Sequence, residues 1–459
     1  MFSYIQPSFI LICLLFTGSR VQAKNLFFAD GQKETLSRLP AQAASDKPVS
    51  IPFSIKAATT GVPPKTSKAQ QPGVVPAATL ASTLVASIGF GSPPQQLSIL
   101  LDTGSTLFWV RSTKCRSSFC NGKPMFNSES SSSFQQGPSP GGNSSSQTIT
   151  YGDGTRINCT VSQDTVAFGD LKIVNQNICE ATLITTSTAE TDGIMGVGPP
   201  NGRTSAADFM KTFNSQFSTT IMSFWYNSDL HNVGADATSG EITLGGLNPA
   251  RYEASSPIVW ASISDDRRYW ILPLTSLKNS TNDSIFPANP IPLIIDTGTT
   301  QNLLPNALAA QFNNQIGAKM SAGGQYTMDC AGAKKIQTFT FTFSGNAVVT
   351  LSGSELVFRA PSSSICYSIF QPSDGSISIV GAWFLRNFYT VFDYQQARIG
   401  FGVPTYSGNS TTPSPSPTAP NPSLNQPPLM TPPLTISKNN ALKSAHTAIM
   451  TMFCILGFI

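Results

Sequence analysis

The chain reads ILLDTGST at residues 99–106 and LIIDTGTT at residues 293–300. In each copy three apolar residues precede an aspartate, which predicts that Asp102 and Asp296 stand at the ends of buried strands. The glycine two residues later, Gly104 or Gly298, permits a tight turn that offers backbone N–H groups to the carboxylate. One Asp-Thr-Gly is usually only a strand-ending turn. Two copies in matched settings predict a symmetric site where two lobes meet.

The repeat extends beyond these motifs. An apolar-apolar-Gly triplet follows each one, first as Ile194-Met195-Gly196 and then as Ile379-Val380-Gly381. The two triplet glycines stand 94 and 85 residues after the aspartates, so the repeat is as long as a domain.

The body of the chain, from about Ala78 to Pro404, has the pattern of a mostly β protein. Short runs such as Phe339–Phe343 alternate apolar and polar residues between clusters of Gly, Ser, Asn and Pro. Helical periodicity is scarce, and the best candidate is Pro305–Ile316, with Pro305 in the first turn. Of the 459 residues 40% are hydrophobic and 11% charged, which excludes a coiled coil and a highly charged disordered chain.

The body resembles the pepsin-like aspartic endopeptidases along nearly its whole length. Trp109-Val110 follows the first Asp-Thr-Gly at the family's spacing, and Tyr151–Gly154 is similar to the tip of the family's flap hairpin. Further segments that resemble the family are Phe126 with Ser130–Ser132, Gly240–Gly246, Phe384–Tyr389 and Phe392-Asp393. The resemblance implies an all-β-dominated, bilobal fold whose two lobes are related by a pseudo-two-fold axis and flank a central cleft.

By this resemblance the chain is an enzyme that hydrolyses peptide bonds without a metal, a cofactor or a covalent intermediate. Two close carboxylates cannot both ionise easily, so Asp102 and Asp296 share one proton. The ionised member activates a water and the protonated member donates to the peptide carbonyl. The residues with supporting roles in the two loops are Thr103 and Thr297, which brace the loops against each other, Gly104 and Gly298 at the turns, and Ser105 and Thr299, which hydrogen-bond the outer carboxylate oxygens.

The flap has its own expected roles. Tyr151 would cover a specificity pocket and hydrogen-bond Trp109, with Gly152 at the hairpin tip. Taken alone, a hairpin Tyr and a core Trp are ordinary structural residues. Asp153 is more specific, because an acid here in fungal-type relatives goes with a basic residue before the cut bond. We therefore predict cleavage after Lys as well as after bulky apolar residues.

The sequence departs from the family in three places. Ala382 follows Gly381 where many acid-acting members carry an Asp, which leaves the pH optimum open. The Ser-, Gly- and Pro-rich stretch at residues 135–147 is interpreted as a surface insertion before the flap. The Cys159 and Cys179 pair has no counterpart that we can assign in the family.

The cysteines of the body are even in number. Cys13 lies in the signal region and Cys454 in the tail, which leaves Cys115, Cys120, Cys159, Cys179, Cys330 and Cys366. In an oxidising compartment six cysteines indicate three disulfides, with fifteen possible connectivities, and we expect neighbours to pair. A zinc site is the competing interpretation, but there is no Cys-x-x-Cys.

The chain holds only His231 and His446, so Ser-His and Cys-His mechanisms are disfavoured. His231 lies in a loop-like stretch without a nucleophile motif, and His446 lies in the tail. A phosphoaspartyl phosphotransferase, which Asp296-Thr297-Gly298-Thr299 could suggest, would need a Lys between Asp and Thr. A third class is a non-catalytic binding or cell-wall protein of the same fold. Such relatives usually lack an Asp or the flap Tyr, and here Asp102, Asp296 and Tyr151 are all present.

Both ends of the chain resemble processing signals. Residues 1–23 carry a short apolar run and then Val21-Gln22-Ala23, a pattern that a signal peptidase reads. Thr447–Ile459 is a short apolar tail after a polar spacer and the small residues Asn439-Asn440-Ala441, so residues 441–459 suit a glycosylphosphatidylinositol (GPI) attachment signal. A poorly packed terminus or a short tail anchor are the alternatives. Residues 405–440 are rich in Pro, Ser and Thr and are interpreted as an extended stalk.

Five Asn-x-Ser/Thr sequons agree with secretion, although the pattern is also frequent by chance: Asn143, Asn158, Asn279, Asn282 and Asn409.

The charge is unevenly placed. The net +4 comes from 28 basic and 24 acidic residues, and residues 24–73 alone hold seven basic and three acidic ones. Without residues 1–73 and 441–459, 19 basic and 21 acidic residues remain, a net charge of −2. We interpret residues 24–73 as a basic propeptide that inhibits an acidic cleft, in which Lys56, Lys65 or Lys68 could contact the aspartates. The alternative is a solvated disordered linker.

The expected organisation is therefore a signal peptide (1–23), a propeptide (24–73), an N-terminal lobe (74–255), a C-terminal lobe (256–404), a stalk (405–440) and a GPI signal (441–459). The expected protein is a monomer that resembles the GPI-anchored fungal (yapsin-like) members of the family. It would reach the cell surface or cell wall, bind polypeptide substrates, be tethered to the membrane by a GPI lipid, and have no nucleic-acid partner.

Overall fold

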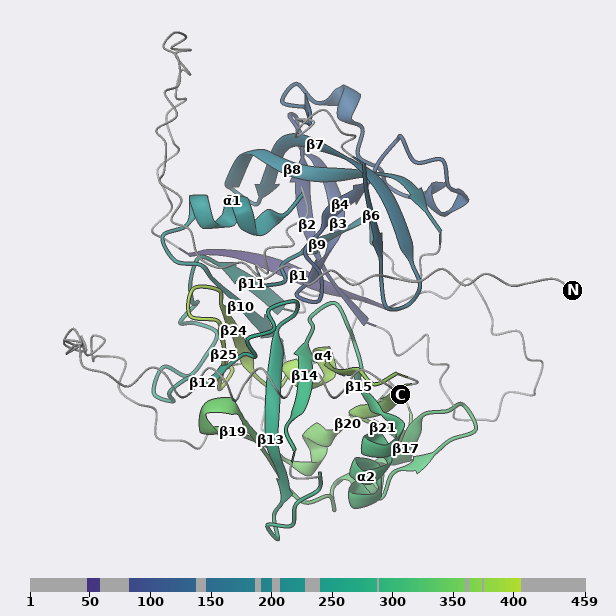
Figure 1. Cartoon of the computed structure of the whole chain (residues 1–459), viewed down its shortest axis with the longest axis vertical. Helices are drawn as coiled ribbons and strands as arrows, with labels where there is room; N and C mark the ends of the chain where they lie inside the picture. Colours follow the sequence, from purple (N-terminus) through teal and green to yellow (C-terminus); the bar gives the residue numbers. More distant parts are fainter. Residues whose placement is uncertain are drawn as a thin grey trace, which may run out of the picture. The chain divides into compact units, whose positions relative to one another are not determined.

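The computed structural model describes residues 48–57, 82–137, 146–185, 191–199, 207–227, 240–286, 289–359, 363–373 and 375–405. Figure 1 shows a fold dominated by strands, with short helices at its surface. The α-helices in these ranges are α1 (Phe209–Gln216), α2 (Asn306–Ile316), α3 (Cys330–Ala333) and α4 (Ala382–Leu385). The expected signal peptide, the GPI signal and the stalk beyond Thr405 lie outside the described residues, as do both histidines, Lys65, Lys68, Asn143 and Asn409.

The first sheet is 14-stranded and joins most of the N-terminal half to strands from the end of the chain. In hydrogen-bonded order its strands are β12 (Val259–Ser262), β25 (Arg398–Gly402), β24 (Tyr389–Asp393), β10 (Ile221–Tyr226), β11 (Gly240–Leu244), β1 (Val49–Ala57), β2 (Ser82–Phe90), β3 (Gln95–Asp102), β9 (Gly193–Gly196), β4 (Phe108–Arg111), β8 (Leu171–Ile184), β7 (Arg156–Phe168) and β5 (Gln135–Gln136), with β6 (Ser146–Thr150) also paired to β7.

The C-terminal half forms the other two sheets. The seven-stranded sheet runs in the order β19 (Ala347–Leu351), β18 (Phe339–Phe343), β13 (Ile271–Asn279), β14 (Ile291–Ile295), β23 (Ser378–Val380), β15 (Asn302–Pro305) and β22 (Phe370–Ser373). The four-stranded sheet contains β16 (Lys319–Met320), β17 (Tyr326–Asp329), β21 (Ile365–Ser368) and β20 (Val357–Arg359). The expected β-dominated, two-lobed fold is confirmed.

The two halves repeat one strand arrangement. In the first, β3 lies between antiparallel β2 and parallel β9, and β4 pairs antiparallel with β9 and parallel with β8. In the second, β14, β13, β23, β15 and β22 take the same places with the same directions. The triplets noted in the sequence lie at the strands beside the aspartates, with Met195 opposite Leu101 and Val380 opposite Ile295. The repeat in the sequence therefore reflects a repeat in topology.

β1 lies inside the segment interpreted as a propeptide, yet it is an integral strand. It pairs antiparallel with β11 on one side and β2 on the other, where Phe53 is opposite Gly240 and Ala86 (Figure 1). Ile51 and Phe53 are buried in the main hydrophobic core. Burying two such side chains contributes about 1.5–3 kcal/mol each, so this part of the segment stabilises the fold.

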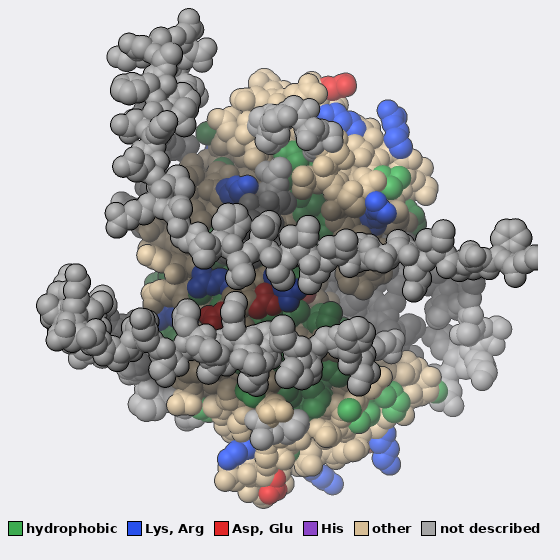
Figure 2. Space-filling view, in the orientation of Figure 1, with side chains coloured by type: hydrophobic (Ala, Val, Ile, Leu, Met, Phe, Trp, Pro, Cys, Tyr) green, Lys and Arg blue, Asp and Glu red, His purple; other side chains and the backbone are tan. Residues whose placement is uncertain are grey.

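One hydrophobic core runs through both halves. Trp270 is at its centre, edge-on to Tyr394 at 4.8 Å and to Phe392 at 5.1 Å between ring centroids. Figure 2 shows how few Lys, Arg, Asp and Glu side chains lie on one face of the molecule, as the 11% charged composition implies.

The three disulfides join neighbours in the sequence, as expected. They are Cys115–Cys120, Cys159–Cys179 and Cys330–Cys366. Cys159–Cys179 ties β7 to β8, whose strands already pair, and Cys330–Cys366 ties α3 to β21. Such bonds are typical of proteins that fold in the secretory pathway.

One expectation about local structure needs adjustment, and a second lies mostly outside the described residues. The predicted helix begins at Asn306 and ends at Ile316, with Gly317 as its left-handed cap (φ 77°), and Pro305 precedes the first turn because it ends β15. The expected insertion at 135–147 is described only at its two ends, where Gln135 and Gln136 pair with β7 as β5, and Ser146 and Gln147 begin β6.

Candidate active site

The two Asp-Thr-Gly motifs leave equivalent strands. β3 ends at Asp102, and β14 ends one residue before Asp296. The backbone of each aspartate is held by the neighbouring parallel strand or its extension: Val197 N donates to Asp102 O at 2.7 Å, and Asp296 N donates to Val380 O at 2.9 Å.

The two threonines cross between the lobes. Thr103 Oγ1 accepts a hydrogen bond from Thr297 N (2.9 Å) and donates one to Ile295 O (2.9 Å). Thr297 Oγ1 accepts from Thr103 N (3.1 Å) and donates to Leu101 O (2.8 Å). Both threonines are buried, so these four hydrogen bonds lock the motifs together away from water.

Each carboxylate is held by its own loop in the same way. Gly104 N donates to Asp102 Oδ1 at 2.8 Å, and Ser105 Oγ donates to Oδ2 at 2.5 Å. For Asp296, the donors are Gly298 N to Oδ1 at 2.8 Å and Thr299 Oγ1 to Oδ2 at 2.6 Å.

The loop glycines show how close the two motifs approach. A Cβ atom placed on Gly104 would lie 2.6 Å from Cγ of Asp296, and one placed on Gly298 would lie 2.5 Å from Oδ1 of Asp102. Each glycine therefore packs directly against the other lobe's carboxyl group, and any larger residue would push the two apart.

The residues predicted for the flap tip follow β6 and precede β7. Trp109 Nε1 donates to Tyr151 Oη at 2.8 Å. At the tip, both carboxylate oxygens of Asp153 accept hydrogen bonds from Thr155, from N at 2.8 Å and from Oγ1 at 2.9 Å. Gly152 has no atom within 4 Å of the place its Cβ would occupy. Tyr151 thus contacts Trp109, and Asp153 shapes the turn at the hairpin tip.

The family model described as "Eukaryotic aspartyl protease" matches residues 83–403. This chain belongs to that family. The protease is 31% identical over 325 residues to vacuolar protease A of Neurospora crassa, a match that covers 68% of this chain and 76% of the relative. It is 31% identical over 338 residues to cathepsin D of Gallus gallus (68% and 79%) and 28% identical over 339 residues to Renin-2 of Mus musculus (71% and 80%).

The aspartyl protease is thus an aspartic-type endopeptidase that acts on polypeptides, and its two carboxyl groups differ in their surroundings. Burial, and then the charge of Asp296, raise the pKa of Asp102 well above its ordinary 3.8, against the opposing hydrogen bond from Ser105. Burial and the charge of Asp102 also raise the pKa of Tyr151, so this hydroxyl stays neutral. The pair therefore retains a proton at pH values where an isolated aspartate has lost it.

Sequence reasoning missed the layer behind the dyad. Val197 follows β9 and its carbonyl accepts from Tyr394 Oη (2.5 Å), with Trp270 Nε1 at 3.4 Å. Trp270 O in turn accepts from Ile295 N at 2.9 Å. Tyr226 is also fully buried, with the charge of Asp296 contributing to its raised pKa. These residues lie far apart in the sequence and have no shared motif, so no local signal marks them.

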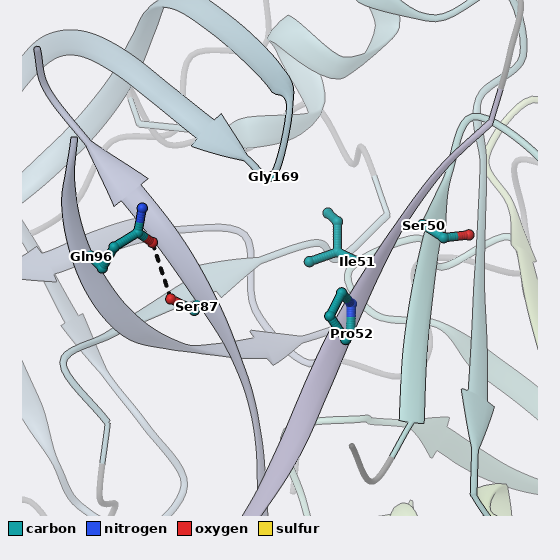
Figure 3. A pocket seen from close by; sticks show the side chains of 6 residues that line it. All are labelled: Ser50, Ile51, Pro52, Ser87, Gln96 and Gly169. Carbon is teal, nitrogen blue, oxygen red and sulfur yellow. Dashed lines mark hydrogen bonds between the residues drawn. The ribbon is translucent and has the colours of Figure 1, made fainter. Parts of the chain in front are cut away.

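The protease also has a shallow cavity of about 280 Å³ away from this site. It is lined by Ser50, Ile51, Pro52, Ser87, Gln96 and Gly169 (Figure 3). Its polar groups include Ser87, which donates to Gln96 at 3.0 Å. None of the expected site residues lines it. Among the side chains that the structure describes, no group of three or more His, Cys, Asp and Glu could hold a metal ion.

Proposed function

We propose that Asp102 and Asp296 are the catalytic pair of this endopeptidase and that Thr103, Thr297, Gly104, Gly298, Ser105 and Thr299 hold them. The observation that carries this assignment is the mutual contact of each loop glycine with the opposite carboxyl group. Burial and the charge of Asp296 raise the pKa of Asp102, and within this proposal we assign the shared proton to Asp102 and the role of base to Asp296. The peptide-library digest at the end of the Discussion tests the assignment.

In this mechanism a water between the two carboxyl groups loses a proton to Asp296 as its oxygen attacks the peptide carbonyl. Asp102 gives its proton to the carbonyl oxygen, which forms a neutral gem-diol. Collapse of the gem-diol returns a proton to Asp102, breaks the C–N bond and moves the proton held by Asp296 to the leaving nitrogen. Ser105 and Thr299 keep the outer carboxylate oxygens occupied, so the inner oxygens face the water.

The pH dependence follows from the raised pKa. A carboxyl group with a raised pKa is protonated below that value and ionised above it, and the mechanism needs Asp102 protonated. Activity is therefore present in acid and falls as the pH rises through the raised pKa of Asp102. Tyr151 and Trp109 are proposed to cover the substrate as the flap closes.

We also propose the domain limits given by the sequence, with residues 24–73 as an inhibitory propeptide. The strand β1 favours the propeptide over a loose linker for this segment, because β1 pairs on both edges and buries Ile51 and Phe53. A variant that lacks residues 24–73 is expected to be secreted at least about fivefold less than the full chain, because its core is incomplete while it folds. Normal secretion of that variant would count against the propeptide role. A variant that lacks only residues 24–47 is the control and should fold, since β1 is kept.

The flap carboxylate is proposed to admit a basic residue before the cut bond. Asp153 is exposed, so its attraction for Lys is modest, and we expect Asp153→Ser to lower cleavage after Lys about threefold relative to cleavage after Leu. Asp153→Asn removes the charge and keeps one of the two oxygens that accept from Thr155, so it should show the same loss. Competition between two peptides that differ only in Lys and Leu measures the ratio. If Asp153→Ser cleaves after Lys as well as the wild-type enzyme does, Asp153 does not have this role.

We propose that the protease is tethered to the cell surface or cell wall by a GPI lipid after the stalk, as in the fungal (yapsin-like) members it resembles. No helix in the part of the chain that the structure describes is long and apolar enough to cross a membrane. Phosphatidylinositol-specific phospholipase C should release most of the enzyme from intact cells, and a variant that ends at Asn440 should appear in the medium without the phospholipase. Enzyme that stays on the cells after treatment, with a GPI-anchored control released, would contradict the tether.

A further inference from the structure

The two loops that follow Asp102 and Asp296 differ in chemistry at one position that is fully buried in both lobes. Six residues after Asp102 stands Phe108, and six residues after Asp296 stands Asn302. Both side chains are fully buried. Phe108 packs edge-on against Phe90 in the hydrophobic core, at 5.7 Å between ring centroids. The C-terminal lobe thus has a primary amide where the N-terminal lobe has an aromatic ring.

The Asn302 side chain accepts a backbone hydrogen bond whose counterpart in the other lobe is accepted by a backbone carbonyl. Gly196 N donates to the carbonyl of Leu107 at 3.1 Å. The equivalent amide, Gly381 N, donates instead to Oδ1 of the Asn302 side chain at 2.8 Å. Nδ2 of Asn302 has no hydrogen-bond partner among the described residues. Leaving this buried donor without a partner costs stability.

A short chain of contacts leads from Asn302 to the carboxylate. Ala382 N donates to Thr299 O at 2.9 Å, and a Cβ placed on Gly381 would meet the same oxygen at 2.2 Å. Gly381 and Ala382 are therefore pressed against the backbone of Thr299. The hydroxyl of Thr299 donates to Asp296 Oδ2 at 2.6 Å. A shift of Gly381 would move this hydroxyl off the carboxylate.

We propose that Asn302 is a positioning residue that fixes the Gly381–Ala382 turn and thereby keeps the Thr299 hydroxyl on Asp296. The inference rests on the proposed role of Asp296 as the base. In this role Asn302 acts through Gly381 and Thr299 and not on the reacting atoms. It makes the two sides of the dyad unequal, because a side chain sets the loop of Asp296 and the backbone sets the loop of Asp102.

Asn302→Leu tests this directly. It removes the acceptor for Gly381 N, and we expect kcat to fall on the order of 10-fold to 100-fold, with KM within about twofold, because the misplaced group acts on chemistry. The acidic limb of the pH–rate profile should move to higher pH, since the ionised carboxylate loses a stabilising hydrogen bond. The wild-type enzyme is measured in the same assays. If it is active, an unchanged Asn302→Leu contradicts only the role of Asn302, and if it is inactive, the proposed function itself fails.

Asn313→Leu is the matched control. Asn313 is equally buried in the same lobe, and its Nδ2 donates to Ala309 O (2.8 Å) and Phe370 O (3.0 Å), away from the dyad. It should lower the thermal midpoint without changing kcat or the acidic limb. Asn302→Asp, neutral in acid, offers the same carbonyl oxygen to Gly381 and should recover kcat to within about threefold of wild type.

Two results overturn the proposal. One is an Asn302→Leu enzyme whose kcat and acidic limb match those of wild type, or change only as much as those of Asn313→Leu. The second result concerns the case in which Asn302→Leu does not fold. A folded Asn302→Asp enzyme whose kcat in acid is reduced more than 10-fold then overturns the role of Asn302. Recovery by Asn302→Asp, with low kcat in Asn302→Ser, whose side chain is too short for Gly381, supports it.

Discussion

Replacing Gly298 by alanine is expected to lower kcat/KM at least about 100-fold while the protein stays folded. The new methyl group would lie 2.5 Å from Oδ1 of Asp102 and 2.8 Å from its Cγ, well inside van der Waals contact. The carboxyl groups must then separate, and a misplacement of about 1 Å is enough for a loss of this size. Gly104→Ala should behave alike, since its methyl group would lie 2.6 Å from Cγ of Asp296. Steady-state kinetics on one peptide in acid measure both.

Gly323→Ala is the control for this pair. Gly323 is exposed, and the nearest atom to its added Cβ is Ser321 Oγ at 3.7 Å, so activity should be unchanged. Near-ultraviolet circular dichroism should show native packing for all three variants. A folded Gly298→Ala enzyme with wild-type kcat/KM would mean that the distance between the carboxyl groups does not govern the reaction.

Asp296→Asn is expected to lower kcat at least about 1,000-fold, because an amide cannot take the proton from the attacking water. The loop should survive, since the amide oxygen can still accept from Gly298 N and Thr299 Oγ1. Asp102→Asn should lose activity to a similar degree for a different reason, because it removes the proton donor. Active-site titration of the preparation, followed by single-turnover kinetics, excludes traces of wild type. More than about 1% residual activity would contradict the role of Asp296.

The thermal stability of Asp296→Asn should not fall with its activity. Burial, and then the charge of Asp296, raise the pKa of Asp102, so protonation of Asp102 stabilises the folded state. This stabilisation is complete below the ordinary pKa of 3.8 and is lost as the pH rises through the raised value. Asp296→Asn removes the repulsion, so its thermal midpoint at pH 7 should equal or exceed that of wild type. A variant that is inactive and more stable separates catalysis from folding.

Much of the site could be predicted from the sequence because its chemistry is local. Asp102 and Asp296 each follow three apolar residues and precede a glycine, and such a pattern fixes a strand end and a turn within a few residues. The crossing of Thr103 and Thr297 came from family resemblance, and the structure shows its four hydrogen bonds.

The rest depends on contacts between distant segments. Trp270, Tyr394 and Asn302 approach the dyad through tertiary packing, and no spacing in the sequence joins them to it. β1 was missed for another reason. The charge of residues 24–73 favours an inhibitory segment but gives no sign that Ile51 and Phe53 are buried on a strand of the main sheet. Net charge carries no information about such pairing.

The central claim is that two aspartates activate a water for peptide hydrolysis, and a peptide-library digest by the mature protein between pH 3 and pH 7 tests it most directly. The digest is run with and without a transition-state mimic such as pepstatin. We expect cleavage in acid that declines as the pH rises and is abolished by the mimic. No cleavage at any pH in this range, or cleavage that the mimic leaves unchanged, would contradict the claim.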